Sequence, residues 1–433
     1  MFTILLQQFY GATDLFVVGH FATTSDVVAV SIGSQIMMML THMILGLTTG
    51  TTVLLGQYFG AKNEERLSKT VGGAVPLFAS IAIIATIAML FLCSKIVSLM
   101  NTPTQAIDVT RSYITICSSG LVFIIGYNVI SAIMRGLGDS KSPMIFVAVA
   151  CVINVVLDLV FVCNFGMGAS GTALATVIAQ FGSLAFAIIF LRRRGIGFKF
   201  HTHDIRFERK TTRDTLVIGS PLALQNILVS ISFLFITLII NRMGLVASAS
   251  AGVVEKLIGF LMLPSIAFSA AVSTMAAQNI GAGQFARAKK SMWAGIRISL
   301  CCAIVVCTYS QFFGETLTRL LTADQAVITM AAEFIRTYSL DCIMVAFVFC
   351  MNGFFNANCH SMFSMTHSII STFAGRIPLA IFFSGLPGAT MLTIGFAAPA
   401  STLISIILCF FFLRYLSKID RKIANSPAFN VNN

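Results

Sequence analysis

The chain has 433 residues, of which 57% are hydrophobic and only 10% are charged. A soluble globular domain carries roughly 25% charged residues, so this composition excludes a soluble protein and indicates an integral membrane protein. The formal net charge of +12 would suit a nucleic-acid-binding protein, but Lys and Arg lie in alternate loops between apolar segments, which excludes that class.

Apolar segments long enough to cross a membrane occupy nearly the whole chain. A transmembrane helix needs about 20 apolar residues, and the sequence offers about twelve such segments, with almost no length left for a soluble domain. We therefore predict an all-α integral membrane protein with twelve transmembrane helices. The predicted spans are residues 1–20, 27–56, 70–93, 112–134, 143–163, 170–191, 215–240, 247–277, 291–313, 328–356, 361–384 and 390–414.

The positions of the basic residues predict the orientation of the chain. Of the 28 Lys and Arg residues, 20 lie in or at the edge of the loops after the second, fourth, sixth and eighth spans or after the last span, and 5 lie in the opposite loops or, for Arg336, in the part of the tenth span next to one. Loops rich in Lys and Arg stay on the cytoplasmic side, so both termini are predicted to be cytoplasmic in a multi-pass protein of the bacterial plasma membrane. The same loops could also contact anionic lipid.

The two halves of the sequence repeat. GQYFGAKNEERLSK at residues 56–69 returns as AQNIGAGQFARAKK at residues 277–290, which aligns Gln57 with Gln278. Such a repeat indicates duplication, and six spans per half give both halves the same orientation. We predict an N-terminal lobe at 1–191, a basic cytoplasmic linker at 192–213, a C-terminal lobe at 214–416 and a cytoplasmic tail at 417–433. The second half begins with RDTLVIGSPL, which has no counterpart in the first half, so about ten residues are predicted to be missing before Met1.

Polar side chains inside the apolar segments form the candidate site. Asp14 lies in the first predicted span, Asn154 and Asp158 in the fifth, and Thr176 in the sixth. Asn154 and Asp158 are four residues apart and share one face of a helix. Asp158 precedes the glycine-rich turn at residues 164–171 by about six residues and Thr176 follows it by about six, so both lie roughly 9 Å from one membrane face. Asp14 lies at a similar distance from its own loop, so the four side chains share one depth.

The chemistry of these side chains suits a cation. An ionised carboxylate in the bilayer costs at least ~3 kcal/mol, so such acids face protein or water and usually serve a function. Two carboxylates in one dry pocket cannot both ionise cheaply, so one of them should hold a proton. With an amide and a hydroxyl nearby, the same oxygens could ligate sodium. We predict a coupling-cation site for H⁺ or Na⁺ at Asp14, Asn154, Asp158 and Thr176, with a structural role for the acids as the alternative.

Other polar features have weaker predictions. Asp341 lies inside the tenth span and is a possible second-lobe site. Arg376 in the eleventh span is expected to form an interhelical ion pair or to reach the interface, although it could meet an anionic ligand group. The GQxxGA-type segments are expected to end helices. The eleven cysteines show no metal-ligand spacing, so buried free thiols are expected, with no metal beyond a possible Na⁺ at the coupling site.

These segments resemble the multidrug and toxic compound extrusion (MATE) family of transporters over essentially the whole chain. The resemblance rests above all on LLQQFYGATDLFVVGHF (5–21), INVVLDLVFVCNFGMGASGTALATVIAQ (153–180), YSLDCI (338–343) and GRIPLA (375–380). It implies two six-helix lobes around a central cleft and a secondary antiporter. Such a transporter exports amphipathic, often cationic compounds in exchange for H⁺ or Na⁺, without a cofactor.

The resemblance also assigns residues. It places the first-lobe cation site on the same four residues, Asp14, Asn154, Asp158 and Thr176, and the acid of the sodium-driven branch at Asp341. That branch has a glutamate in the seventh span, where this chain has Gln225 or Asn226, and this departure weakens a second-lobe sodium site.

Two other functions were weighed. A flippase for a lipid-linked saccharide, from the same superfamily, would need a cleft lined with Arg or Lys, and the predicted spans hold few arginines, among them Arg297 and Arg376. A membrane-embedded enzyme would need a His, Asp or Cys cluster with catalytic spacing, which the sequence lacks. We predict a monomeric transporter that is not an enzyme. Its partners are small amphipathic molecules and the lipid bilayer, with no nucleic acid.

Overall fold

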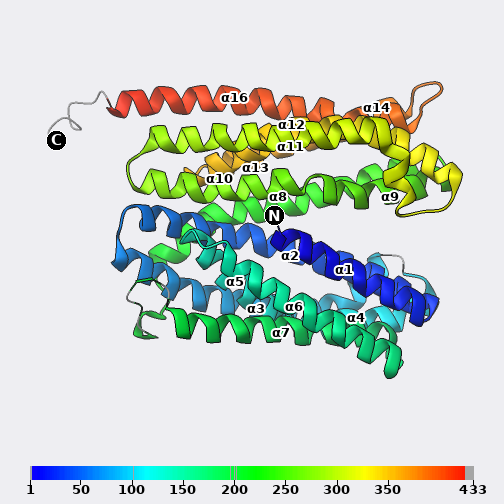
Figure 1. The fold of residues 1–433 in the computed structure, drawn as a ribbon, viewed down its shortest axis with the longest axis horizontal. Helices are drawn as coiled ribbons and strands as arrows, with labels where there is room; N and C mark the ends of the chain where they lie inside the picture. Colours follow the sequence, from blue (N-terminus) through cyan, green and yellow to red (C-terminus); the bar gives the residue numbers. More distant parts are fainter. Residues whose placement is uncertain (1, 101, 196, 199, 201, 425–433) are drawn as a thin grey trace. The chain divides into compact units, whose positions relative to one another are not determined.

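The computed structural model describes residues 2–100, 102–195, 197–198, 200 and 202–424. These residues are almost entirely helical and contain no strand (Figure 1). The helices, in chain order, are α1 (Phe2–Phe21), α2 (Thr24–Gly60), α3 (Glu64–Leu99), η1 (Thr104–Ala106), α4 (Ile107–Ser119), α5 (Leu121–Gly136), α6 (Lys141–Asp158), η2 (Leu159–Asn164), α7 (Gly168–Arg194), η3 (Thr202–Asp204), α8 (Arg209–Asn241), α9 (Leu245–Leu261), α10 (Leu263–Gly281), α11 (Phe285–Arg319), α12 (Gln325–Ala357), α13 (Ser361–Ile369), η4 (Ile370–Arg376), α14 (Ile377–Ser384), α15 (Met391–Gly395) and α16 (Ala397–Ala424).

The helices are long and apolar enough for a membrane. Among the described residues, nine helical stretches meet this criterion, and the bent pair of Thr104–Ser119 with Leu121–Gly136 would make ten. The remaining predicted spans, the first and the eleventh, are helical as well, at α1 and at α13, η4 and α14. The predicted all-α membrane fold is therefore confirmed.

Several predicted spans are interrupted rather than straight. The fourth bends by 46° at Gly120, where an added Cβ would lie 2.6 Å from Val177, so glycine permits the close approach to α7. The eighth breaks at Met262, two residues before Pro264, whose ring and missing N–H disfavour a continuous helix. The fifth and eleventh contain the π-helical segments η2 and η4. Hydropathy alone could not predict these breaks.

The described chain divides into two compact units. The first comprises residues 1–227, 273–289 and 356–361, and the second comprises residues 228–272, 290–355 and 362–433, as far as these are described. In the first unit α6 packs against α7 and α1, and α2 packs against α5 and α4 (Figure 1). The lobe boundaries set from sequence, 1–191 and 214–416, stay a prediction. The predicted truncation before Met1 and the tail residues 425–433 lie outside the described residues.

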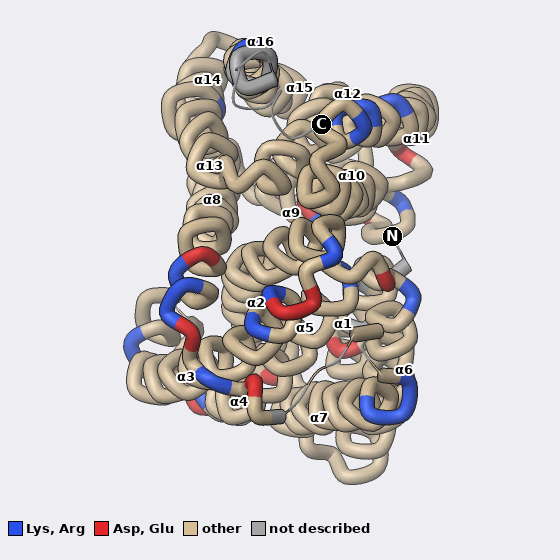
Figure 2. Tube along the Cα trace, turned by 90° about the vertical axis from the view of Figure 1, so that its left-hand side faces the viewer, with Lys and Arg blue, Asp and Glu red and all other residues tan. Residues whose placement is uncertain are grey.

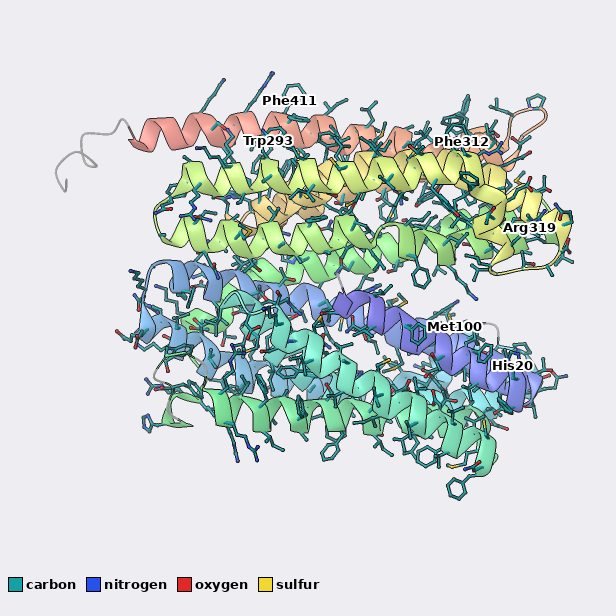
Figure 3. All side chains as sticks on the ribbon, viewed as in Figure 1. His20, Met100, Trp293, Phe312, Arg319 and Phe411 are labelled. Carbon is teal, nitrogen blue, oxygen red and sulfur yellow. The ribbon has the colours of Figure 1, made fainter. Side chains whose placement is uncertain are left out.

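The second unit has its own apolar core. This core contains Phe334, Ile335 and Tyr338 of α12, together with Val254 of α9 and Ile394 of α15. Large apolar side chains also project from this unit, including Phe312, 77% exposed, and Phe411, 65% exposed (Figure 3). An exposed apolar surface of this kind suits contact with lipid.

Charged residues of the first unit gather at helix ends. Figure 2 shows Lys, Arg, Asp and Glu concentrated at the ends of the helices that face the viewer. His20 of α1 and Met100 after α3 lie together at the other end of this unit, on the right in Figure 3. The long apolar stretches of these helices carry few charged residues besides the acids described below.

The two GQxxGA-type segments end α2 and α10 and contact each other within the first unit. Gln57 donates from Nε2 to the Ala357 carbonyl at 2.8 Å, and Gln278 donates from Nε2 to the Gly136 carbonyl at 3.1 Å. Each glutamine thus satisfies a carbonyl at the end of another helix. Gly60 and Gly281 allow the two backbones to approach closely, because an added Cβ would lie 1.9 Å and 1.8 Å from the carbonyl oxygens of Gln278 and Gln57. The expected structural role is confirmed, and it is a reciprocal one.

Candidate functional site

The structure brings the four predicted site residues together in the first unit. Asn154 of α6 donates from Nδ2 to the Thr176 hydroxyl of α7 at 3.4 Å, and that hydroxyl donates to Asp14 Oδ2 of α1 at 3.5 Å. The carboxyl groups of Asp14 and Asp158 interact directly, and Asp14 also lies beside Asn154. Residues 162 positions apart in the sequence therefore meet in one cluster, as the shared depth predicts.

The cluster is buried and short of hydrogen-bond donors. Asp14 is 5% exposed, Asn154 1% and Asp158 0%. Within the described part of the chain, no donor reaches Asp14 Oδ1, Asn154 Oδ1 or either oxygen of Asp158. No ion pair among the described residues involves Asp14 or Asp158. Buried acceptors in this state are costly unless a proton or a cation joins them.

The oxygens present fit a hard cation. Two carboxylates, an amide oxygen and a hydroxyl are ligands that hard cations prefer, and the same carboxyls can share a proton. A small hollow between α6 and α7 adjoins the cluster and is lined by Ala150, Asn154, Thr176, Ala179 and Gln180. The role of the cluster in cation binding stays a prediction.

A π-helical segment begins directly after Asp158. The α-helix α6 ends at Asp158, and η2 continues as a π-helix from Leu159 to Asn164. Segments of this type are rare and frequently occur at functional sites. The extra residue in a π-helical turn changes the direction in which the side chains of that turn point. Segment η2 contacts both α1 and α7, so it lies between the elements that carry Asp14 and Thr176.

Asp26 joins the start of α2 to the start of α7, the helix that carries Thr176, and it was not among the residues singled out from the sequence. Asp26 forms a capping box with Thr23 at the start of α2, and its Oδ1 also accepts from the Ala169 backbone N–H at 2.9 Å. It therefore caps α2 and α7 together. Gly168 has a φ of +54°, and an added Cβ there would lie 2.4 Å from Asp26 Oδ1. The signal in the sequence was the Thr23-x-x-Asp26 pattern, which is typical of a helix start.

The second unit contains a different arrangement around Asp341. Arg376, the last residue of η4, lies with Nη2 3.6 Å from Asp341 Oδ2 of α12. The Arg376 guanidinium also lies over the Phe233 ring at 5.5 Å, and its Nε donates to the Ser401 hydroxyl at 3.4 Å. Of the two expectations for Arg376, the interhelical ion pair is confirmed. Asp341 is buried, as expected, but it is not part of a cluster of acids.

The described part of the chain contains no group of three or more His, Cys, Asp or Glu side chains that could hold a metal ion. The eleven cysteines all lie in this part and are unpaired, and most of them are buried or half-buried. The expectation of free thiols rather than a disulfide framework is confirmed.

Long apolar helices and a buried polar cluster that joins three of them define the class of protein: a multi-pass helical membrane transporter. The MatE family model matches residues 1–160 and 221–382, so the chain belongs to this family, the MATE transporters. It is accordingly a transporter and not an enzyme.

Known relatives extend over nearly the whole chain. It is 26% identical to the probable multidrug resistance protein YoeA of Bacillus subtilis (strain 168), over 96% of this chain and 91% of the relative. It is 22% identical to the multidrug export protein MepA of Staphylococcus aureus (strain N315), over 90% of this chain and 86% of the relative. A solved outward-facing multidrug resistance MATE family transporter of the MOP superfamily has the same fold, with a TM-score of 0.91 and 19% identity over 98% of this chain and 94% of that one.

Proposed function

We propose that this transporter exports amphipathic, cationic compounds from the cell in exchange for protons or sodium. The names of its relatives, which are multidrug resistance and multidrug export proteins, support the substrate class. We place it in the bacterial plasma membrane as a monomer with both termini cytoplasmic, an orientation supported by the excess of Lys and Arg in alternate loops.

The buried acid pair of Asp14 and Asp158 is the observation that carries the proposal. Two carboxyls, 5% and 0% exposed, face each other without a basic partner among the described residues. Three of their four oxygens have no donor there. A site of this kind is satisfied only when it takes up positive charge, whether as a proton shared between the carboxyls or as a sodium ion held by them with Asn154 and Thr176.

Positive charge at this cluster can be coupled to a conformational change through α1. Asp14 connects α1 to α6 and α7, and α1 packs against both helices and against η2. Neutralising the acids removes their repulsion and changes how tightly α1 is held. The cation drives transport only to the extent that it binds the outward-facing state and the inward-facing state with different affinity.

The flippase alternative gains no specific support. It requires basic side chains that face a lipid phosphate, yet Arg376 is ion-paired with Asp341 and Arg297 is an exposed residue of α11. Asp341, the possible second-lobe site, lies beside Arg376 and so differs from the Asp14–Asp158 pair, which has no basic partner among the described residues.

Efflux of a fluorescent cationic dye from energised cells, paired with dye binding to the purified protein, tests the proposal. Asp14→Asn and Asp158→Asn should each abolish gradient-driven efflux and leave dye binding largely intact, because they remove the charge that the cation neutralises. Asn154→Ala and Thr176→Ala should cause partial loss, because they remove ligating or hydrogen-bonding oxygens but no charge. Near-normal efflux by a well-expressed Asp158→Asn protein would contradict the proposal.

A further inference from the structure

The second unit contains a buried acid whose partner is a fixed basic side chain rather than another acid. Asp341 is 0% exposed and the Arg376 side chain 13% exposed, and their charged atoms lie 3.6 Å apart. Among the described residues this is the ion pair with the least exposed partners. The contact with Arg376 is electrostatic, because neither Asp341 oxygen accepts a hydrogen bond from the described residues, although the Thr402 hydroxyl lies beside the carboxyl.

The guanidinium is held in place from two further directions. Phe233 of α8 lies under it, and Ser401 of α16 accepts a hydrogen bond from Nε. A guanidinium stays charged at every physiological pH and is well suited to buried ion pairs. Its position at the end of the π-helical segment η4 fixes where that charge lies.

The two units thus meet the same electrostatic problem in different ways. In the first, Asp14 and Asp158 have no basic partner in the described chain. Their negative charge can therefore be balanced only by a proton or a sodium ion that binds from solution. In the second, the balancing charge is covalently part of the chain. An acid with a guanidinium 3.6 Å away binds a proton or a sodium ion less tightly than the same acid would without that partner.

We propose that Arg376 acts as a tethered cation for Asp341, so that only the first-unit cluster binds the coupling ion and sets the number of ions exchanged per substrate. This inference rests on the proposed antiport function and deepens it.

The ion-to-substrate ratio tests the proposal directly. Purified protein in proteoliposomes, with the membrane potential clamped near zero, is given a gradient of one pH unit, or a tenfold sodium gradient if sodium drives the wild type. The ethidium gradient at which net exchange stops is then measured. Each coupled cation changes that limiting gradient by about tenfold.

Two substitutions give opposite expectations. D341N should slow exchange but leave the limiting ethidium gradient unchanged, because Asp341 carries no coupling ion. R376Q should make it about tenfold steeper, because the freed Asp341 carboxyl becomes a second cation site. R376K is the matched control, since it keeps the positive charge and should keep the wild-type ratio. A limiting gradient about tenfold shallower in D341N, or an unchanged one in a folded R376Q protein, would overturn the proposal.

A thermal cycle separates failure of this inference from failure of the antiport function. Melting temperatures of the wild type, D341N, R376Q and D341N/R376Q are compared in detergent, where no transport occurs. Each single variant should melt lower than the wild type, and the double variant should recover most of the loss, because no buried charge is left alone. Additive losses would show that the charges of Asp341 and Arg376 do not balance each other, and would overturn the proposal even if gradient-driven exchange were observed.

Wild-type protein without gradient-driven exchange would refute the antiport function, and the thermal cycle would still decide whether Asp341 and Arg376 are paired. Binding of the anionic dye fluorescein by the wild type that is lost in R376Q would also overturn the proposal, since the arginine would then be a ligand group.

Discussion

Replacing Gly60 by alanine should destabilise the contact between the ends of α2 and α10. An added Cβ at Gly60 would lie 1.9 Å from the Gln278 carbonyl oxygen and 2.7 Å from the carbonyl carbon. Both neighbours are backbone atoms, which cannot rotate away as a flexible side chain can. The two helix ends would have to separate by more than an ångström, and this separation would lengthen the hydrogen bond from Gln278 to Gly136.

The size of the effect follows from two opposing contributions. Inserting a methyl group into a well-packed contact typically costs about 1–3 kcal/mol. Alanine is favoured over glycine inside a helix by roughly 0.5–1 kcal/mol, which offsets part of that cost. The severity of the overlap puts the steric cost in the upper part of its range, so we expect a net destabilisation of about 1–2 kcal/mol. Gly281→Ala should behave in the same way, because its Cβ would lie 1.8 Å from the Gln57 carbonyl oxygen.

Thermal unfolding of purified protein in detergent measures this effect. Gly259→Ala is the matched control: Gly259 lies inside α9, and no atom would lie within 4 Å of its added Cβ. The control should melt at the wild-type temperature or slightly above it, while Gly60→Ala and Gly281→Ala should melt a few degrees lower. If Gly60→Ala proved as stable as Gly259→Ala, the close approach of these two helix ends would be refuted.

Three further predictions concern the loops. Asp26→Ala should destabilise the protein by about 1–2 kcal/mol, because it removes the cap shared by α2 and α7. Asp26→Asn should destabilise it less, because it keeps an accepting oxygen. Equal melting temperatures for the wild type and Asp26→Ala would count against the shared cap. Asp139 lies between α5 and α6, where burial raises the pKa of its carboxyl, but hydrogen bonds from Ser142 and Lys141 and the nearby Arg194 hold the pKa below its ordinary value. The stability that Asp139 provides over an Asp139→Asn variant should therefore be constant above about pH 5 and shrink as the pH falls further. Melting curves at several pH values measure it, and an advantage that grew on acidification would contradict the prediction. A cysteine introduced at Asn164, in a background without native cysteines, should react with an impermeant thiol reagent on intact cells, whereas one at Arg209 should not. The reverse labelling pattern would show that the proposed orientation is inverted.

The sequence was sufficient to predict the apolar helices and the members of the polar cluster. Spans were visible because a membrane helix must be apolar along its whole length. The meeting of Asp14, Asn154, Asp158 and Thr176 was predictable because the helix rise converts the distance from a loop into depth. A depth argument gives no angular position around a helix, so the direct contact of Asp14 with Asp158 could be learned only from the structure.

The features that sequence could not predict depend on the packing between helices. The π-helical segments η2 and η4 have no composition signature, since they occur where neighbouring helices favour one extra residue in a turn. The capping box at Thr23 and Asp26 was readable, but its second acceptor contact with Ala169 joins segments 143 residues apart. Likewise, Asp341 and Arg376 each stood out alone, and only the fold places one beside the other.

The central claim is that uptake of a cation by the Asp14–Asp158 cluster drives transport. Wild-type and Asp158→Asn proteins are reconstituted into proteoliposomes, and ethidium movement is measured first with an imposed proton or sodium gradient and then as ethidium–ethidium exchange without any gradient. The account predicts that Asp158→Asn loses the gradient-driven movement and retains the exchange, since the transport pathway stays intact while its coupling is removed. Gradient-driven accumulation by Asp158→Asn at the wild-type rate would contradict the account.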